Sequence, residues 1–162
     1  MKKTFLFAAL GLAGALLAAP PETEVSGKMT IDGKPVVLQY AYRDDTDPEE
    51  PIVVLSDQAL PAEAVPFVPG KLVKDKQLHA LAFSVSRKDR KLTNTVGKVY
   101  CPGHEMGVGL GRVEEGNVAL AIDRLDAASI AGGISTVKPV KLSYVAYEFD
   151  LKFRTGAGHP KP

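Results

Sequence analysis

The stretch YCPGHEMG, residues 100–107, contains the kinds of side chain that bind copper. Cys101, the only cysteine of the chain, is followed by His104 and then by Met106. Thiolate, imidazole and thioether are the soft ligands that hold copper in proteins. The same stretch could equally form a turn, because a Pro-Gly pair separates the cysteine from the histidine. A metal site and a structural turn are therefore the two interpretations of these residues.

The stretch also resembles the copper-binding loop of cupredoxins, in which Cys, His and Met follow one another between the last two strands of a β-sandwich. The resemblance implies that Cys101 is the thiolate ligand, His104 an imidazole ligand and Met106 the axial thioether. It further implies a second imidazole on a neighbouring strand, and His79 is the only histidine upstream of Cys101. A copper-binding or redox protein that uses Cys101, His104, Met106 and His79 is thus one functional hypothesis.

The spacing of these four residues favours the structural interpretation. Only one residue separates His104 from Met106, which is tighter than in cupredoxin loops, and several strand-like runs still follow Cys101. In the structural interpretation, Cys101 packs as a small apolar residue at the end of a strand and the Pro-Gly pair makes a turn. His79 would then be a hydrogen-bonded core residue, because it lies on the apolar face of a strand.

The N-terminal segment MKKTFLFAALGLAGALLAAP has the layout of a secretory signal peptide. Lys2 and Lys3 precede an uncharged apolar run from Phe5 to Ala19, and small residues lead into Pro20. The apolar run is shorter than the roughly 20 residues of a membrane-spanning helix. The sequence therefore predicts a signal peptide over residues 1–19, no membrane span after its removal, and a periplasmic or extracellular protein.

Charge and motif content exclude several classes of function. Residues 20–162 carry 18 basic side chains, the 20 of the whole chain less Lys2 and Lys3, against 19 acidic ones. A nucleic-acid-binding domain presents a basic surface, so no nucleic-acid partner is expected. No serine or cysteine lies in a recognisable motif with a histidine and an acid, so we expect a protein that is not an enzyme. No cofactor is indicated apart from the copper of the alternative.

Most of the chain has the pattern of short β-strands. Asp32-Gly33 lies between two strand-like runs and predicts a tight hairpin. In SYVAYEFDLKFRT, apolar residues from Val145 to Phe153 alternate with charged ones, as in an antiparallel strand with one face in water. Gly132-Gly133, inside another such run, predicts a bulge or a close backbone approach.

These runs predict an all-β protein. About eight strands separated by turn residues are typical of an antiparallel β-sandwich or a small barrel. The proline-rich segment from residue 58 to residue 70 leaves room for at most one short helical turn, near residues 62–65. We expect a single β domain over residues 20–154 and a flexible C-terminal tail over residues 155–162.

Five segments, in order, resemble a group of small exported bacterial proteins of uncharacterised function. They are GKMTIDGKPVVLQYAYR, IVVLSDQALP, LHALAFSVS, SIAGGIS and YEFDLKF, and they span residues 27–154. The resemblance implies an exported, mostly β domain and assigns it no activity or catalytic residue. The first functional hypothesis is therefore a binding or envelope-associated module whose ligand is an unknown protein, glycan or small molecule.

Overall fold

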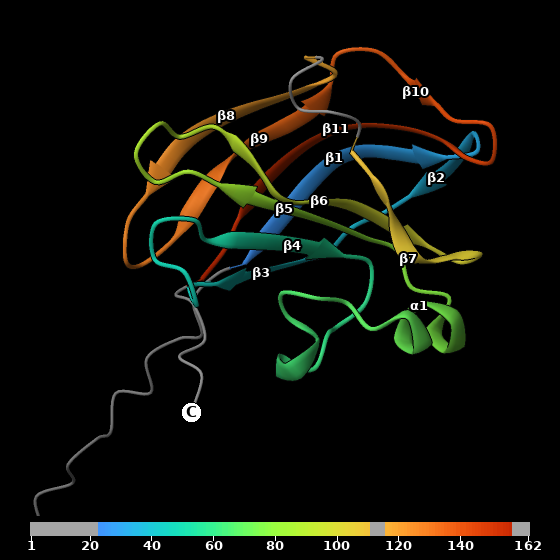
Figure 1. Ribbon diagram of the computed structural model, residues 1–162, viewed down its shortest axis with the longest axis horizontal. Helices are drawn as coiled ribbons and strands as arrows, with labels where there is room; N and C mark the ends of the chain where they lie inside the picture. Colours follow the sequence, from blue (N-terminus) through green and yellow to red (C-terminus); the bar gives the residue numbers. More distant parts are fainter. Residues whose placement is uncertain (1–22, 111–115, 157–162) are drawn as a thin grey trace, which may run out of the picture.

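The protein is a β-sandwich of two antiparallel sheets (Figure 1). The computed structural model describes residues 23–110 and 116–156. The predicted signal peptide, residues 1–19, lies outside these ranges. The sequence left a sandwich and a barrel open, and the sandwich is the observed architecture. No helix within the described ranges is long and apolar enough to cross a membrane.

The first sheet, sheet A, joins the two ends of the described chain. Its strand order is β2-β1-β11-β9-β8, and β10 pairs with β11 beyond the end of β9. Its strands are β1 (Glu24–Ile31), β2 (Lys34–Val36), β8 (Val118–Leu125), β9 (Ile130–Thr136), β10 (Val140–Lys141) and β11 (Ala146–Arg154).

The second sheet, sheet B, is a meander of consecutive strands in the order β3-β4-β5-β6-β7. Its strands are β3 (Tyr40–Asp44), β4 (Ile52–Ser56), β5 (Ala80–Val85), β6 (Leu92–Cys101) and β7 (His104–Gly109). The described residues hold eleven strands, more than the eight or so predicted. The predicted run after Gly33 is divided into β2 and β3, β7 was not predicted, and β10 is too short to show an alternating pattern.

The main core lies between the two sheets. Along β11, Tyr147, Phe149, Leu151 and Phe153 are buried and the residues between them are exposed, which confirms the alternation predicted for this strand. The ring of Phe153 meets that of Phe83, on β5 of the opposite sheet, edge to face with 5.4 Å between centroids. Such an edge-to-face contact between two buried rings fastens the sheets to each other.

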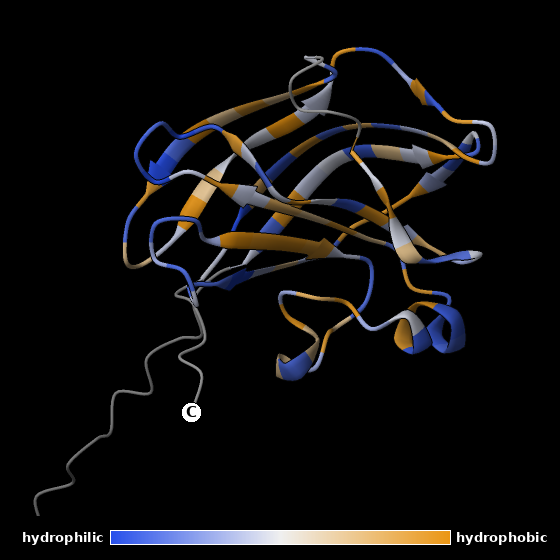
Figure 2. Cartoon of the chain, in the orientation of Figure 1, coloured by the Kyte–Doolittle hydropathy of each residue, from blue (hydrophilic) through white to orange (hydrophobic). Residues whose placement is uncertain are grey.

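A third layer covers the outer face of sheet B. Residues 57–79 fold back over it and form a second apolar cluster with the outward side chains of β4, β5 and β6. All of β4 and β5 is therefore buried, and β4 is orange along its length in Figure 2. The outer face of sheet A has no such cover among the described elements (Figure 1).

The third layer contains more helix than the sequence predicted. The expected turn is present as the 3-10 helix η1 (Ala62–Ala64), but the α-helix α1 (Gly70–Lys76) follows it. This helix begins directly after Pro69 and buries only Val73, so seven residues show no helical periodicity. The expectation of at most one short helical turn is corrected accordingly.

Both predicted tight turns are observed. At the β1–β2 hairpin, Asp32 and Gly33 have positive φ angles of 51° and 73°, as a two-residue hairpin turn requires. At the β6–β7 hairpin, Cys101 pairs with His104 across Pro102 and Gly103, whose φ is 86°. The structural interpretation of YCPGHEMG as a strand end and a Pro-Gly turn is therefore confirmed.

The C-terminal boundary of the domain differs from the prediction. Thr155, assigned to the flexible tail, is fully buried, and its Oγ1 accepts a hydrogen bond from the backbone N–H of Ile130 at 3.0 Å. Its own N–H donates to the carbonyl of Ile130 at 2.8 Å. Thr155 therefore belongs to the sandwich, while residues 157–162 of the predicted tail lie outside the described residues.

Candidate functional site

The four predicted copper ligands lie at one end of sheet B, where only His79 and Cys101 line the same cavity. Cys101, at the end of β6, is 2% exposed and belongs to the main core. His104, opposite it on β7, places its ring 5.2 Å from that of Tyr144. The side chain of Met106 is 82% exposed. The structure thus directs the thioether away from the thiol.

His79 has a partner that sequence reasoning did not identify. Its Nδ1 lies 2.8 Å from Oδ2 of Asp57, and its backbone N–H donates to Oδ1 of the same carboxylate at 3.0 Å. When Nδ1 carries the proton that this carboxylate accepts, Nε2 is the unprotonated nitrogen of the neutral ring. Asp57 directly follows β4, and no local pattern links it to a histidine 22 positions later.

His79 and Cys101 nevertheless line one cavity, which we call the end pocket. It has a volume of about 380 Å³ and is lined by residues of the β1–β2 hairpin and of the rim of sheet B. Ile31, Val36 and Pro102 provide apolar walls, and Lys34 and Gln77 add polar groups. Among the described residues, no three His, Cys, Asp or Glu side chains are grouped so that they could hold a metal ion. A trigonal copper site with an axial methionine is therefore not assembled.

The thiol of Cys101 is held in its protonated form. Burial, followed by the negative charges of Asp32 and Glu105, raises its pKa from 9.0 to about 11. Each of these causes disfavours the thiolate, because a buried anion loses its hydration and is repelled by nearby carboxylates. Cys101 is thus not a ready nucleophile at neutral pH.

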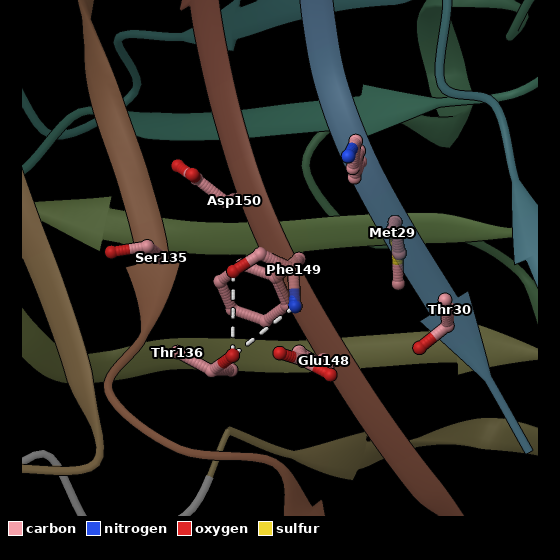
Figure 3. A pocket seen from close by; sticks show the side chains of 8 residues that line it. Met29, Thr30, Ser135, Thr136, Glu148, Phe149 and Asp150 are labelled. Atoms are coloured by element: carbon pink, nitrogen blue, oxygen red, sulfur yellow. Dashed lines mark hydrogen bonds between the residues drawn. The ribbon is translucent and has the colours of Figure 1, made fainter. Parts of the chain in front are cut away.

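A second cavity, which we call the face pocket, lies on the uncovered outer face of sheet A (Figure 3). It opens where β11 changes partner, because β11 pairs with β9 from Asp150 onward and with β10 at Tyr147. Between these two ladders, Oγ1 of Thr136 accepts a hydrogen bond from the N–H of Phe149 at 3.2 Å and donates one to its carbonyl at 3.3 Å. A side chain therefore closes the gap that the parting strands leave.

The face pocket has a volume of about 440 Å³ and a polar lining. Its floor is low because β9 turns only small side chains outward here, Gly133 and Ser135 among them. Lys28, Asp150 and Ser135 form one row across β1, β11 and β9. Thr30 and Glu148 form the next row. Figure 3 shows these polar side chains around the opening, while the ring of Phe149 lies beneath the sheet.

Most polar side chains of the face pocket make no hydrogen bond or ion pair with other described residues of the chain. Within the part of the chain that the structure describes, five of them make no hydrogen bond or ion pair through their side chains: Lys28, Thr30, Ser135, Glu148 and Asp150. Even Lys28 and Asp150, which face each other across β1 and β11, form no ion pair. A smaller hollow of about 200 Å³ continues along the same strands, between Glu24, Lys152 and Arg154. Nothing in the sequence pattern marked this site, because alternating polar residues are typical of any exposed sheet face.

Comparison of the chain with models of protein families, with curated proteins and with solved structures found no match. The resemblance to small exported bacterial proteins therefore stays a prediction.

Proposed function

We propose that this protein is an exported, non-enzymatic binding module that holds a neutral, hydroxyl-rich ligand, a segment of a glycan, in the face pocket. The observation that carries the proposal is the set of five partnerless polar side chains around one hollow. Two carboxylates, two hydroxyls and one ammonium group supply both acceptors and donors within a single opening. Sugar hydroxyls both donate and accept, so they match a lining of this kind.

The charges of the lining argue against strongly charged ligands. Glu148 and Asp150 would repel a polyanion, and Lys28 lies directly opposite Asp150 and would weaken the attraction for a polycation. An added peptide strand is also a poor fit, because the backbone groups of β1 and β11 are already paired with each other beneath the pocket. A neutral polar ligand avoids each of these costs.

Export rests on the basic start and apolar run of residues 1–19. A binding role on the outer side of the cell is consistent with a stable sandwich whose polar sheet face is left open. Sequencing the N-terminus of the protein recovered from the periplasm or medium tests export directly. Recovery only from the cytoplasm, with Met1 retained, would refute it.

The binding proposal is tested by titrating ¹⁵N-labelled protein with soluble tetrasaccharides of α-linked glucose, β-linked glucose and β-linked N-acetylglucosamine. We expect one of these probes to shift the amide signals of Gly133, Ser135 and Thr136, which line or adjoin the pocket. The double variant Glu148→Gln/Asp150→Asn and the filling variant Ser135→Leu should weaken this binding at least about tenfold, or about 1.4 kcal/mol.

The matched control carries the same two changes elsewhere. Glu63→Gln/Asp75→Asn alters one exposed glutamate and one exposed aspartate of the third layer, on the far side of sheet B. Its affinity should equal that of the wild type. Absence of shifts at the face pocket with all three probes, or equal affinity in the pocket variants and the control, would overturn the proposal.

A further inference from the structure

One carboxylate, two imidazoles and one thiol follow one another along the rim of sheet B. The last registered pair of β4 and β5 is Ser56 with Ala80, so the next position sets Asp57 against His79. Hydrogen bonds from Asp57 N to His79 O and from His79 N to the Asp57 carboxylate confirm this neighbourhood. The order along the rim, from β4 to β7, is Asp57, His79, Cys101, His104.

The register also makes His79 and Cys101 close neighbours. The last registered pair of β5 and β6 at this end is Ala80 with Tyr100, so the next position, just before β5 begins, sets His79 against Cys101. The backbone N–H and carbonyl of His79 both bond toward Asp57, so on the β6 side His79 occupies a non-hydrogen-bonded pair position. In antiparallel sheets this is the closer kind of pair, with Cα atoms about 4.5 Å apart.

Both side chains project into the same space. His79 continues the inward face of Leu81, and Cys101 continues that of Val99. Both residues line the end pocket. Asp57 holds Nδ1 of His79, whereas Nε2 has no hydrogen-bond partner among the described residues. A carboxylate that binds one imidazole nitrogen and orients the other is the usual outer shell of a metal-binding histidine.

We propose that the end pocket is a binding site for a soft monovalent metal ion, Cu(I), held between Sγ of Cys101 and Nε2 of His79. Two soft donors can satisfy a Cu(I) ion, which accepts a low coordination number. Zinc needs four ligands in a tetrahedron, and blue copper needs two histidines beside the cysteine. No three His, Cys, Asp or Glu side chains of the described residues are grouped here, so the pair does not supply the ligand sets of zinc or of blue copper.

The surroundings of the pair favour the monovalent ion. Ile31, Val36 and Pro102 give the pocket apolar walls beside the pair. The ion binds by exchange, in which the thiol releases its proton to water, a Cu–S bond forms, and no electron is transferred. The charge of the ion is then cancelled by the thiolate, so the pocket holds a neutral complex.

The test is a competition titration of the full mature protein with Cu(I), without oxygen, against a chromophoric Cu(I) chelator. We expect one equivalent of Cu(I) to bind to the wild type. Cys101→Ser, Cys101→Ala and His79→Gln should lose the 1:1 complex. Asp57→Asn should keep the stoichiometry and weaken the affinity about 10- to 100-fold, because the imidazole loses its orienting partner.

The control variants separate this site from the loop that the sequence suggested. His104→Gln and Met106→Leu should bind Cu(I) like the wild type, whereas a Cys-His-Met loop would lose its ion in both. Cu(I) should also raise the melting temperature of the wild type and of Met106→Leu but not that of His79→Gln. No 1:1 binding, or binding that survives His79→Gln, would overturn the proposal. The outcome is independent of the face pocket, since His79→Gln leaves that lining intact.

Discussion

The hydroxyl of Thr136 takes the place of a backbone partner for Phe149, with 3.2 Å to its nitrogen and 3.3 Å to its carbonyl oxygen. Because a side chain completes this part of the sheet, β9 can leave β11 while no backbone group of Phe149 stays unpaired. The face pocket lies at this point of departure. The opening and the local stability of sheet A therefore depend on one hydroxyl group.

We predict that Thr136→Val destabilises the protein by about 1–3 kcal/mol, because it leaves the N–H and carbonyl of Phe149 without their partner. Thr136→Ser keeps the hydroxyl and should retain most of the stability. Urea unfolding followed by circular dichroism measures both variants. Equal stability of the valine and serine variants would show that water replaces the hydroxyl without cost.

Gly132 should not accept any side chain. A Cβ atom there would lie 2.2 Å from the carbonyl oxygen of Ala121 on β8, which is backbone and cannot rotate away. Gly132→Ala should therefore cost at least about 1–3 kcal/mol, as overpacking does. At Gly133 the nearest atom to an added Cβ is the Leu151 oxygen at 3.5 Å, an ordinary contact.

Gly133→Ala is the matched control for this prediction. It adds the same methyl group one residue along β9 and should change the free energy of unfolding by less than about 0.5 kcal/mol. Urea midpoints of the two variants give the comparison. A tolerant Gly132→Ala would mean that β8 and β9 can separate without loss of stability.

The stability of the protein should fall in alkaline solution partly through Cys101. Its pKa is about 11 in the folded protein and 9.0 when exposed, so the unfolded chain releases the thiol proton first. The free energy of unfolding therefore decreases as pH rises from 9 toward 11. Cys101→Ala should show a shallower decrease over this range. The pKa of Tyr147, which burial raises to about 12, gives both proteins a common further loss at higher pH.

In acid, the protonation of Asp126 should also lower the stability of the protein. Its carboxylate accepts hydrogen bonds from Nε of Arg124 and from the N–H groups of Ala128 and Ser129, in the turn between β8 and β9. The bond from Arg124, followed by that from Ser129, lowers its pKa from 3.8 to about 2. The contribution is complete above pH 3.8 and disappears as pH falls toward 2.

Asp126→Asn measures this contribution. The difference in urea midpoint between wild type and variant should be largest near neutral pH and should shrink as pH falls below 4. A difference that stays constant with pH would assign the effect to the shape of the turn and not to the charge of the carboxylate.

Several features followed from the sequence alone because they depend on neighbours along the chain. The alternation from Val145 to Phe153 identifies one buried face, whatever the strand packs against. Asp32-Gly33 and Pro102-Gly103 form turns because these residues tolerate the backbone angles required. The sequence left the role of Cys101 open between packing and metal binding, and its burial is a finding of the structure. Helix α1 escaped prediction because a seven-residue helix with one buried side chain has no periodic pattern.

The tertiary structure alone decided which side chains meet. Asp57 and His79 are brought together because β4 pairs with β5, although the third layer separates the two strands in the sequence. No spacing of residue types in the sequence predicts this pairing. The face pocket depends on residues of β1, β9 and β11, which are distant in sequence and adjacent only in sheet A. Local patterns determine how each strand is oriented. The order of the strands determines which side chains are neighbours across strands, and hence which residues line both pockets. That order depends on how the whole chain buries its apolar surface.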